Sequence, residues 1–402
     1  MAAVPVGLSV SPETVWWGVR PLAVFEFVGA FFLRALQMLV VPLIVAAIIN
    51  AVAGAGQGIG RLGARTIALY FLTSLVAVLT GLVMVNLITP GIVDGQPAKD
   101  LIGLTASVES LGAVAGTTGS DLWGIFLRMV PNNIVESAAR ADMLSLITFA
   151  VLYGLLVPRL PESTRTLQRD FWQGVYDVMI AMTGLVMYLA PLGVFALVAR
   201  ALANAGFGAF GPLLGFFVTV MAGLAFHMFV TLSLLVLLMG RVNPWRHLRA
   251  MSEALLMAFT TSSSSATLPK TLECLVRSGV PKRVVGFVTP LGATINMDGT
   301  ALYECVAAMF IAQCYGLELG FGVQFVIVTV ALVSSVGVAG IPSASLVAIA
   351  FILTTIGLPV EALGLILAVD RVLDMCRTAV NVYSDSCVTV AVAYGAPADV
   401  PA

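Results

Sequence analysis

The stretch from Val369 to Val390, VDRVLDMCRTAVNVYSDSCVTV, sets polar and charged residues inside an apolar run long enough to cross a lipid bilayer. On an α-helix with about 100° per residue, its five strongest polar groups share one narrow face: Asp370, Asp374, Arg377, Asn381 and Asp385. One charged side chain at mid-membrane costs roughly 2.5–3.5 kcal/mol on insertion scales. A self-neutralising pair of Asp374 with Arg377 is one interpretation, but it leaves Asn381 and Asp385 unexplained. The pattern therefore favours a site for a solute and cations.

The composition places this stretch in a polytopic membrane protein. Of 402 residues, 59% are hydrophobic and only 10% are charged, whereas a soluble domain is about one quarter charged. The net charge of −1 offers no basic surface for nucleic acid. The five cysteines show no CxxC spacing, so the sequence indicates neither a zinc site nor a disulfide framework. His227 and His247 are far apart in the sequence, and each is expected to be structural.

Further apolar stretches predict membrane spans at about 31–52, 66–87, 171–200 and 209–240. The second of these carries Tyr70, Thr73 and Ser74 on one helical side, where hydroxyls commonly hold helices together. Acidic residues gather at 90–121, and basic residues gather at 61–65, 159–169, 241–249 and 277–283. The positive-inside rule places the basic segments in the cytoplasm and the acidic loop outside.

Two segments are too short and too interrupted to be ordinary spans: residues 258–269, AFTTSSSSATLP, and residues 333–345, VSSVGVAGIPSAS. Irregular backbone at membrane depth survives only when it is buried in protein or lines a wet cavity, so both are predicted to be the tips of re-entrant hairpins. A span carrying Asn and Asp follows each of them, at about 284–316 and 361–395. This weak internal repeat is typical of secondary transporters.

A third polar cluster, TINMDGT at residues 294–300, is bracketed by apolar residues. Asn296 and Gly299 favour an unwound turn over a continuous helix. Freed carbonyl groups and the Asp298 carboxylate would supply the hard oxygen ligands that Na⁺ or H⁺ coupling requires. Glu304 adds a carboxyl group inside the membrane; it either carries a proton or makes a hydrogen bond between helices.

These motifs resemble those of the dicarboxylate/amino acid:cation symporter family, which includes neuronal glutamate transporters and archaeal aspartate transporters. The resemblance rests on SSSSATLP at 262–269, GATINMDGTALYE at 292–304, GVAGIP at 337–342 and DMCRTAVN at 374–381, and it extends from about residue 22 to 396. It implies an all-α polytopic protein of the plasma (inner) membrane with the glutamate-transporter fold. That fold has two re-entrant helical hairpins, inverted repeats, an elevator mechanism and a homotrimeric assembly.

The resemblance also implies a division of the chain into a static scaffold and a mobile transport domain. The scaffold would comprise residues 1–65 and 91–206, and the transport domain residues 66–90 and 207–396. Within the latter it implies hairpin 1 at about 245–278, a broken span at 284–316, hairpin 2 at about 320–356 and a last span at 361–395. We expect the family's first span to be shortened or missing here, because only about 20 weakly apolar residues precede the span that holds Pro42.

For the substrate, the resemblance implies that Arg377 meets a side-chain carboxylate and Asp374 the ammonium group. Further substrate contacts are implied for Asn381 and Thr378, for Thr300 as a supporting residue, and for the backbone of Ser263, Ser264, Gly340 and Ile341. A second arginine, which some relatives carry at the position of Ser262 or Met375, is absent.

For cations, the resemblance implies two to three Na⁺ sites and no organic cofactor. The first comprises Asp385, Asn381, Asn296 and the Gly292 carbonyl. The second comprises Thr294 and the carbonyls of Ser335, Val336 and Val338. The third comprises Asp298 and Asn296 with Tyr70, Thr73 and Ser74.

The implied function is Na⁺-coupled symport of L-glutamate or L-aspartate, with Glu304 as the residue for H⁺ cotransport and K⁺ countertransport. The alternative is an H⁺-driven dicarboxylate carrier or a neutral amino acid carrier of the same family. A C4-dicarboxylate has no ammonium group for Asp374, which favours acidic amino acids. An enzyme is not expected, because the GxGD sequence of intramembrane aspartyl proteases is absent and the serine run has no positioned base nearby.

Overall fold

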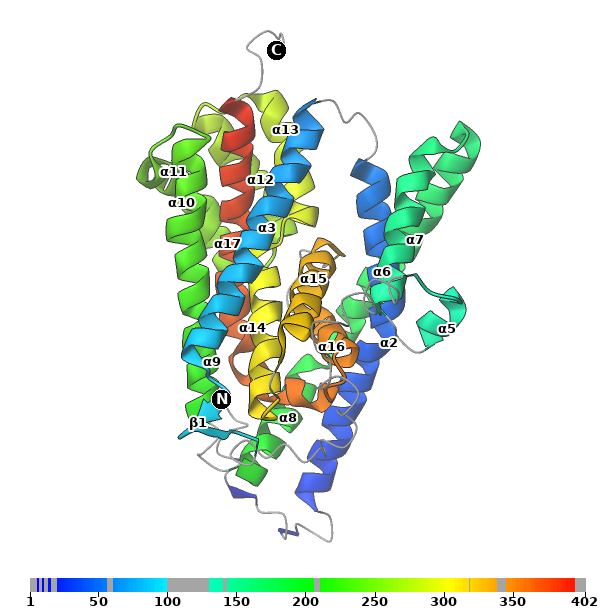
Figure 1. Cartoon of the computed structure of the whole chain (residues 1–402), viewed down its shortest axis with the longest axis vertical. Coiled ribbons are helices and arrows are strands. Elements are labelled where there is room, and N and C mark those ends of the chain that lie inside the picture. Colours follow the sequence, from blue (N-terminus) through cyan, green and yellow to red (C-terminus); the bar gives the residue numbers. More distant parts are fainter. Residues whose placement is uncertain are drawn as a thin grey trace.

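The computed structural model describes residues 20–55, 61–99, 130–139, 143–205, 210–317, 319–337 and 345–394, together with positions 6, 9, 10, 14 and 15. The described chain is almost entirely helical, and its helices run mainly along the long axis of the molecule (Figure 1). The elements are α2 (Pro21–Ala55), α3 (Arg61–Ile88), β1 (Ile92–Val93), β2 (Gln96–Pro97), α5 (Ile134–Ala139), α6 (Met143–Leu156), η3 (Val157–Arg159), α7 (Glu162–Tyr188), α8 (Ala190–Ala205), α9 (Phe210–Phe226), η5 (His227–Thr231), α10 (Leu232–Leu238), α11 (Pro244–Thr261), α12 (Ser264–Arg277), α13 (Lys282–Ile295), α14 (Asp298–Cys314), α15 (Phe321–Gly337), α16 (Ser345–Thr355), η6 (Val360–Ala362) and α17 (Leu363–Tyr394).

The centre of the molecule is α14, which is buried over its whole length. It packs against α3, α9, α15, α16 and α17. A helix that is apolar all round must be surrounded by other helices or by lipid, and here helices surround it. Its N-terminal turn carries Asp298 and Thr300, so this packing also buries polar side chains in the middle of the bundle.

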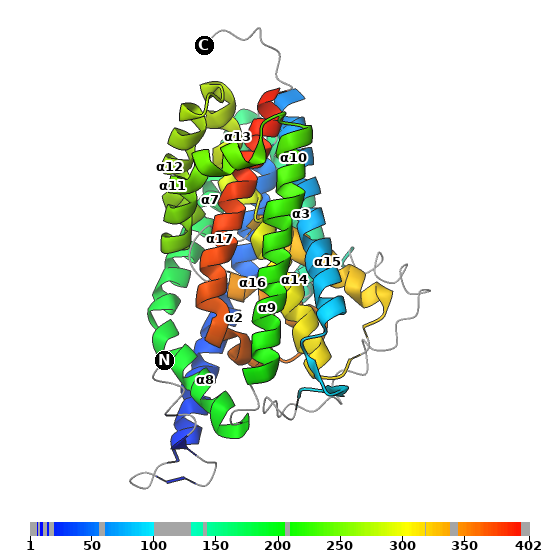
Figure 2. The ribbon, with the colours of Figure 1, turned by 90° about the vertical axis from the view of Figure 1, so that its left-hand side faces the viewer.

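The helices fall into two packing groups. The α14 group comprises α3, α9 to α14 and α17; the α2 group comprises α2, α5, α6, α7 and α8. Figure 1 shows α2, α6 and α7 on one side of the molecule and α3, α10 and α17 on the other. Helices α15 and α16 touch both α2 and α14, and α8 touches α17, so these elements join the two groups. In Figure 2, α17 runs along the molecule between α11 and α12 on one side and α9 and α10 on the other.

Two short breaks in regular helix lie where the sequence predicts them. Helix α11 ends at Thr261, where Ser262 takes a left-handed conformation with φ 51°, and Ser263 caps α12 by accepting a hydrogen bond from the Ala266 N–H. Helix α13 ends at Ile295, and Asn296 and Met297, whose backbone is not helical, separate it from α14. At the first break, the Ser263 side chain bonds to nearby backbone and so competes with the helical ladder. At the second break, the Asn296 side chain bonds instead to Ser384 and Asp385 of α17. The tip between α15 and α16, residues 338–344, lies outside the described residues.

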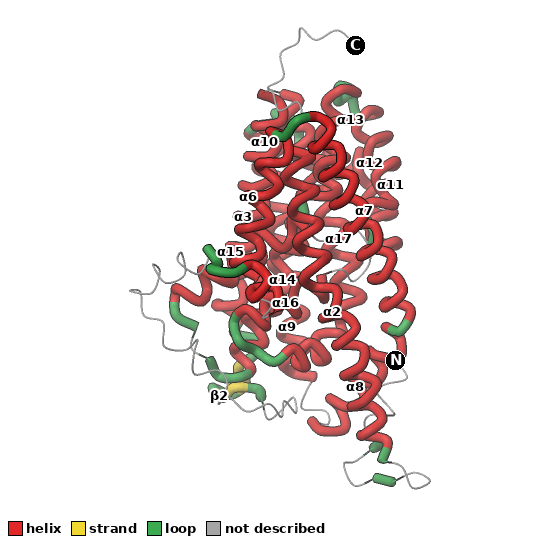
Figure 3. The backbone as a smooth tube through the Cα atoms, turned by 90° about the vertical axis from the view of Figure 1, so that its right-hand side faces the viewer, coloured by secondary structure: helices red, strands yellow, loops and turns green. Residues whose placement is uncertain are grey.

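Strands β1 and β2 form a two-residue hairpin after α3, visible at the edge of the bundle in Figure 3. Asp94 and Gly95 make its turn with φ 50° and 75°, the backbone that tight hairpins require. Most of the acidic 90–121 loop that follows lies outside the described residues.

Two helical stretches of the described chain are long and apolar enough to cross a bilayer unbroken, Leu62–Ile88 and Phe210–Leu238. A third candidate, Glu162–Val186 with Ala190–Arg200, bends by 56°. The sequence predicts one span at 171–200, but the structure divides it into α7 and α8. Pro191 in the first turn of α8 lacks the N–H that a continuous helix needs. Large apolar side chains such as Phe71, Leu79 and Leu214 are exposed on these helices, as a lipid-facing surface requires.

Candidate functional site

Helix α17 is continuous, and it buries all five polar groups of the face that the sequence predicts. Arg377 is only 1% exposed and is the largest fully buried side chain of the described residues. Arg371, six residues earlier on the same helix, keeps 59% of its side chain exposed. The two arginines of this helix therefore have very different environments.

Arg377 is held by two carboxylates through a single nitrogen. Its Nη2 lies 2.8 Å from Asp374 Oδ1 and 3.3 Å from Asp370 Oδ1. The Asp374 pair, which the sequence raises as a structural alternative, is thus present. Within the described part of the chain, however, Arg377 Nε and Nη1 are buried without a hydrogen-bond partner. A buried donor left unpaired costs about 1–3 kcal/mol, so this guanidinium retains two strong donors for an incoming acceptor.

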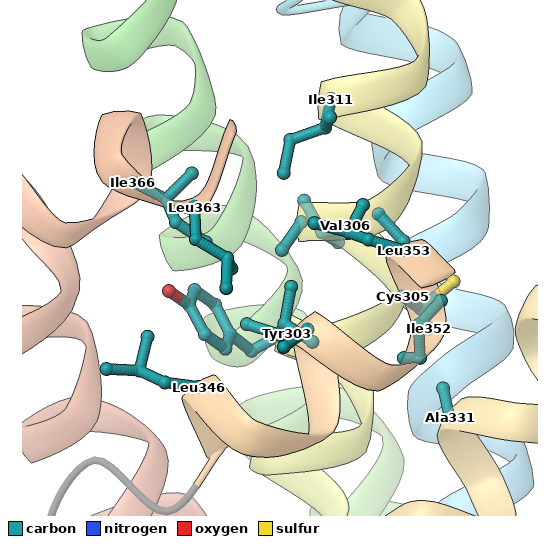
Figure 4. Packing of buried hydrophobic residues seen from close by; sticks show 14 of the residues in the cluster. Tyr303, Cys305, Val306, Ile311, Ala331, Leu346, Ile352, Leu353, Leu363 and Ile366 are labelled. Carbon is teal, nitrogen blue, oxygen red and sulfur yellow. The ribbon is translucent and has the colours of Figure 1, made fainter. Parts of the chain in front are cut away.

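Tyr303 of α14 fixes the other side of the arginine. The guanidinium carbon lies 3.8 Å from the centroid of the Tyr303 ring, a distance at which a cation is attracted to an aromatic face. The Tyr303 hydroxyl donates to Asp370 Oδ1 at 2.8 Å. Figure 4 shows Leu346 of α16 and Leu363 of α17 beside this tyrosine. The cluster is therefore rigid and water-poor.

Asn381 connects the same helix to the start of α14. Its Oδ1 accepts from the Gly299 N–H at 2.7 Å, and its Nδ2 donates to Thr300 Oγ1 at 3.0 Å. Gly299 allows this close approach, because a Cβ there would lie 2.8 Å from the Arg377 carbonyl oxygen. Thr378, one turn after Asp374 in α17, donates its hydroxyl to the Asp374 carbonyl oxygen at 2.8 Å.

The α11–α12 break approaches the site from another direction. Ser264 is buried and its Oγ lies 3.4 Å from the Ala293 carbonyl oxygen, near the end of α13. Both α11 and α12 also pack against α17. Of the four predicted backbone contacts to substrate, Ser263 and Ser264 lie at this break, whereas Gly340 and Ile341 lie outside the described residues.

Asp298 is completely buried, and donors from three other elements surround its carboxylate. Ser74 Oγ of α3 donates to Oδ1 at 2.6 Å, and Thr73 Oγ1 lies 3.4 Å from the same oxygen. Ser384 Oγ of α17 donates to Oδ2 at 2.6 Å, and His227 Nε2 of η5 lies 3.0 Å from Oδ2. The structure therefore brings together Asp298, Thr73 and Ser74, three residues predicted to share a cation site.

Asn296 lies between the two buried carboxylates. Its Nδ2 donates to Asp385 Oδ1 at 2.9 Å, and Thr73 Oγ1 lies 3.2 Å from its Oδ1. Gly292 and Tyr70 lie beside the Asp385 carboxylate. A Cβ at Gly292 would lie 2.5 Å from both Asp385 Oδ1 and the Tyr70 hydroxyl. Carboxylate, amide, hydroxyl and carbonyl oxygens are the ligands of hard cations, and here they gather in one dry place.

The set predicted for the second sodium is less complete. Ser335 is buried and donates to the Leu332 carbonyl at 2.9 Å. Thr294 is exposed and donates to the Leu291 carbonyl at 2.9 Å. Val336 lies near the end of α15, and Val338 lies outside the described residues.

Glu304 lies one to two turns along α14 from Thr300 and is completely buried. Ser334 of α15 donates to its Oε2 at 2.7 Å, while its Oε1 has no partner among the described residues. The hydrogen bond between helices that the sequence leaves open is thus formed. One oxygen of the carboxyl group nevertheless stays available.

Sequence reasoning does not find three of these partners. Ser334 and Ser384 stand among other small residues, and a single serine has no periodic signal. His227 is expected to be structural, yet its ring reaches Asp298 from a π-helical turn, η5, in which the register of the helix shifts. Adjacency to a predicted ligand is a signal that points to Ser334 and Ser384, which precede Ser335 and Asp385, but not to His227.

Apolar helices interrupted beside buried carboxylates, a buried arginine and clustered hydroxyls define a multi-pass membrane transporter rather than an enzyme. A family model covers nearly the whole chain, residues 2–394. The chain belongs to the sodium:dicarboxylate symporter family.

Curated relatives agree with this assignment. The chain is 34% identical to the proton/glutamate-aspartate symporter of Escherichia coli (strain K12), over 91% of this chain and 84% of that protein. It is 35% identical to the proton/sodium-glutamate symport protein of Bacillus subtilis (strain 168), over 95% of this chain and 89% of that protein. It is also 34% identical to excitatory amino acid transporter 1 of Ambystoma tigrinum, over 96% of this chain and 80% of that protein.

Proposed function

We propose that this protein is a secondary active transporter that couples Na⁺ entry to the uptake of L-glutamate or L-aspartate across the plasma membrane. The observation that carries the proposal is the buried guanidinium of Arg377, which contacts Asp374 through Nη2 and whose Nε and Nη1 have no hydrogen-bond partner among the described residues. A planar guanidinium binds a carboxylate through two parallel hydrogen bonds. The Asp374 carboxylate would receive the ammonium group of the same substrate.

The site chemistry distinguishes the substrate classes. A dicarboxylate without an amine would leave Asp374 without its positive partner, and a neutral amino acid would leave the free donors of Arg377 unpaired in a dry site. Unpaired buried polar groups are what make such sites selective. The relatives named for glutamate and aspartate support the same choice.

For cation coupling, we propose two to three Na⁺ sites built on Asp298 and Asp385. A monovalent cation in a water-poor site needs formal negative charge close by, and both carboxylates are buried among neutral oxygen ligands. Thr294 and the carbonyls of Ser335, Val336 and Val338 would form a further site near the α15–α16 tip. No organic cofactor is required.

For the movement, we propose the elevator mechanism of the family fold. The α11–α12 and α15–α16 pairs would be re-entrant hairpins related by an inverted repeat, and three chains would assemble into a homotrimer. Residues 66–90 and 207–396 would move as the transport domain against a scaffold of residues 1–65 and 91–206. The division into an α14 group and an α2 group supports this proposal.

Glu304 is proposed to carry a proton with the substrate and to support K⁺ return. Its Oε1, which has no hydrogen-bond partner within the described part of the chain, supports this role because it leaves one carboxyl oxygen open to a proton or a cation. The Glu304→Gln variant keeps an acceptor for Ser334 and removes the titratable group. Transport by that variant should no longer respond to a pH gradient or to internal K⁺.

Uptake of radiolabelled aspartate and glutamate into proteoliposomes tests the whole proposal when Na⁺, H⁺ and K⁺ gradients are imposed one at a time. We expect accumulation to require an inward Na⁺ gradient. Uptake driven by H⁺ alone, or saturable uptake of succinate or serine in place of aspartate, would support the alternative carrier of the same family.

A further inference from the structure

We infer that Ser384 couples two cation sites to each other, an inference that rests on the proposed function. Its hydroxyl donates to Asp298 Oδ2 at 2.6 Å and accepts from Asn296 Nδ2 at 2.9 Å. The same Asn296 amide donates to Asp385 Oδ1 at 2.9 Å. One hydroxyl and one amide thus link the two buried carboxylates through three hydrogen bonds, two of which the Asn296 nitrogen donates in opposite directions.

These hydrogen bonds fix the orientation of the Asn296 amide. Its Nδ2 faces Ser384 and Asp385, and its Oδ1 faces Thr73, on the side of the Asp298 cluster. Asn296 is the one residue proposed to serve both of these cation sites. The side chains of Ser384, Asn296 and Asp298 are completely buried, so bulk solvent does not reach the bonds between them.

This arrangement predicts positive cooperativity. A cation that binds through Asn296 Oδ1 orders the amide and polarises its N–H bonds, and such polarisation passes along a chain of buried hydrogen bonds. The second cation then meets an Asp385 carboxylate that is already held in place, so it pays less ordering entropy. Without the Ser384 hydroxyl, the amide loses its shortest link to Asp298, and the longer contacts of Thr73 remain.

His227 does not serve this purpose, although it also contacts Asp298 Oδ2. Its Nδ1 has no partner among the described residues, so the ring ends the network rather than continuing it. Thr73 also lies near both groups, but its contacts of 3.2 Å to Asn296 Oδ1 and 3.4 Å to Asp298 Oδ1 are longer than those of Ser384.

The test compares the wild type with Ser384→Ala, Ser384→Thr and Ser386→Ala. Na⁺ activation of aspartate uptake is measured in proteoliposomes, and the Na⁺ dependence of the melting temperature is measured in detergent. Ser386 is the matched control, since it is a buried serine of the same helix whose hydroxyl contacts His247 Nε2 at 2.9 Å and the Tyr383 carbonyl at 2.7 Å.

For Ser384→Ala we expect a Hill coefficient that falls toward one and a half-saturating Na⁺ concentration about fivefold higher or more, the size of a typical coupling between sites. Both measurements should show this, with uptake recovered at saturating Na⁺. Ser384→Thr, which keeps the hydroxyl, and Ser386→Ala should retain the wild-type cooperativity.

A cooperative wild type whose Hill coefficient and half-saturation are unchanged in Ser384→Ala would overturn the coupling alone. Equal losses in Ser384→Ala and Ser386→Ala would overturn it too, because they would reveal a structural role. A wild type indifferent to Na⁺ in both measurements would overturn the proposed function and the coupling together.

Discussion

Two arginines one and a half turns or so apart on α17 illustrate how burial decides the role of a residue. Arg371 is mostly exposed and its Nη1 lies 3.8 Å from Asp374 Oδ2, a long contact that contributes little because its arginine is open to solvent. Arg377 is buried, shares two carboxylates and lies over an aromatic ring. Only Arg377 has its N–H donors in a buried place, where water would not compete with a bound carboxylate for them.

Substrate selection should therefore depend on Arg377. We expect Arg377→Cys to lose uptake of aspartate and glutamate and to accept neutral amino acids such as serine or alanine, because the cysteine cannot pair with a second carboxylate. Competition assays in proteoliposomes measure this change. Arg371→Cys is the control and should keep acidic substrates.

Removal of one partner from a buried ion pair costs about 3–5 kcal/mol, so size-exclusion chromatography must first show that the variant is folded. An Arg377→Cys protein that is folded and binds aspartate as the wild type does would contradict the assignment.

Asp298 and Asp385 are the second pair of residues with predictable effects. We expect Asp298→Asn and Asp385→Asn each to raise the Na⁺ concentration needed for half-maximal uptake by about tenfold or more, since a hydrogen bond or contact to a charged group contributes about 1.5–3 kcal/mol. Na⁺ titration of uptake gives the measurement. Asp177→Asn, in α7 and outside the cluster, is the control. Wild-type Na⁺ curves for both variants would mean that the cations bind elsewhere.

At the scale of elements, the site depends on helices that stop short and on glycines that let helices touch. The break at Asn296 and Met297 turns the first N–H groups of α14 toward α17, where Gly299 donates to Asn381. Orphan N–H groups at a helix start must find partners. The break therefore serves packing as well as ligand binding.

A methyl group at Gly299 should disturb this contact. We expect Gly299→Ala to lower stability by about 1–3 kcal/mol through overpacking, because the new Cβ would lie 2.8 Å from the Arg377 carbonyl oxygen and 3.2 Å from Asn381 Oδ1. Thermal unfolding in detergent measures the loss.

Gly286→Ala is the matched helical control, since a Cβ there meets nothing within 4 Å. Alanine is the better helix former, so this variant should be neutral or slightly stabilised. Equal melting temperatures for the two variants would show that α14 and α17 can separate at no cost.

At the scale of the whole molecule, the α2 group and the α14 group meet at few places, and Leu197 of α8 marks one of them. A Cβ at Gly364 of α17 would lie 3.2 Å from Leu197 Cβ, and a Cβ at Gly29 of α2 would lie 2.6 Å from Leu197 Cδ2. The same leucine therefore touches one helix of each group.

This position allows a direct test of relative movement. In a background whose five native cysteines are replaced by alanine, Leu197→Cys with Gly364→Cys should form a disulfide on oxidation, because the Cβ atoms are close to disulfide range. We expect the cross-link to abolish uptake and reduction to restore it, since the disulfide would join the proposed scaffold to the proposed transport domain.

The control pair, Leu197→Cys with Gly29→Cys, lies within the α2 group and should cross-link without loss of uptake. Full activity of a completely cross-linked 197–364 pair would contradict the elevator mechanism.

The sequence by itself determines the features that depend on one segment at a time. Helical periodicity placed Asp370, Asp374 and Arg377 on one face of α17, and Asn and Gly near residue 296 indicated the interruption between α13 and α14. These predictions succeed because the positions of side chains around one helix follow from the covalent spacing. The cost of charge in lipid then indicates that such a face has a function.

Only the tertiary structure decided which partners those side chains meet. The amide of Asn381 bonds to Gly299 and Thr300, Asp298 receives Ser384 and His227, and Glu304 receives Ser334. Each of these contacts depends on the rotation, crossing and depth of two helices from distant parts of the chain. Those quantities are set by the packing of many apolar side chains at once, and no local pattern in the sequence encodes them.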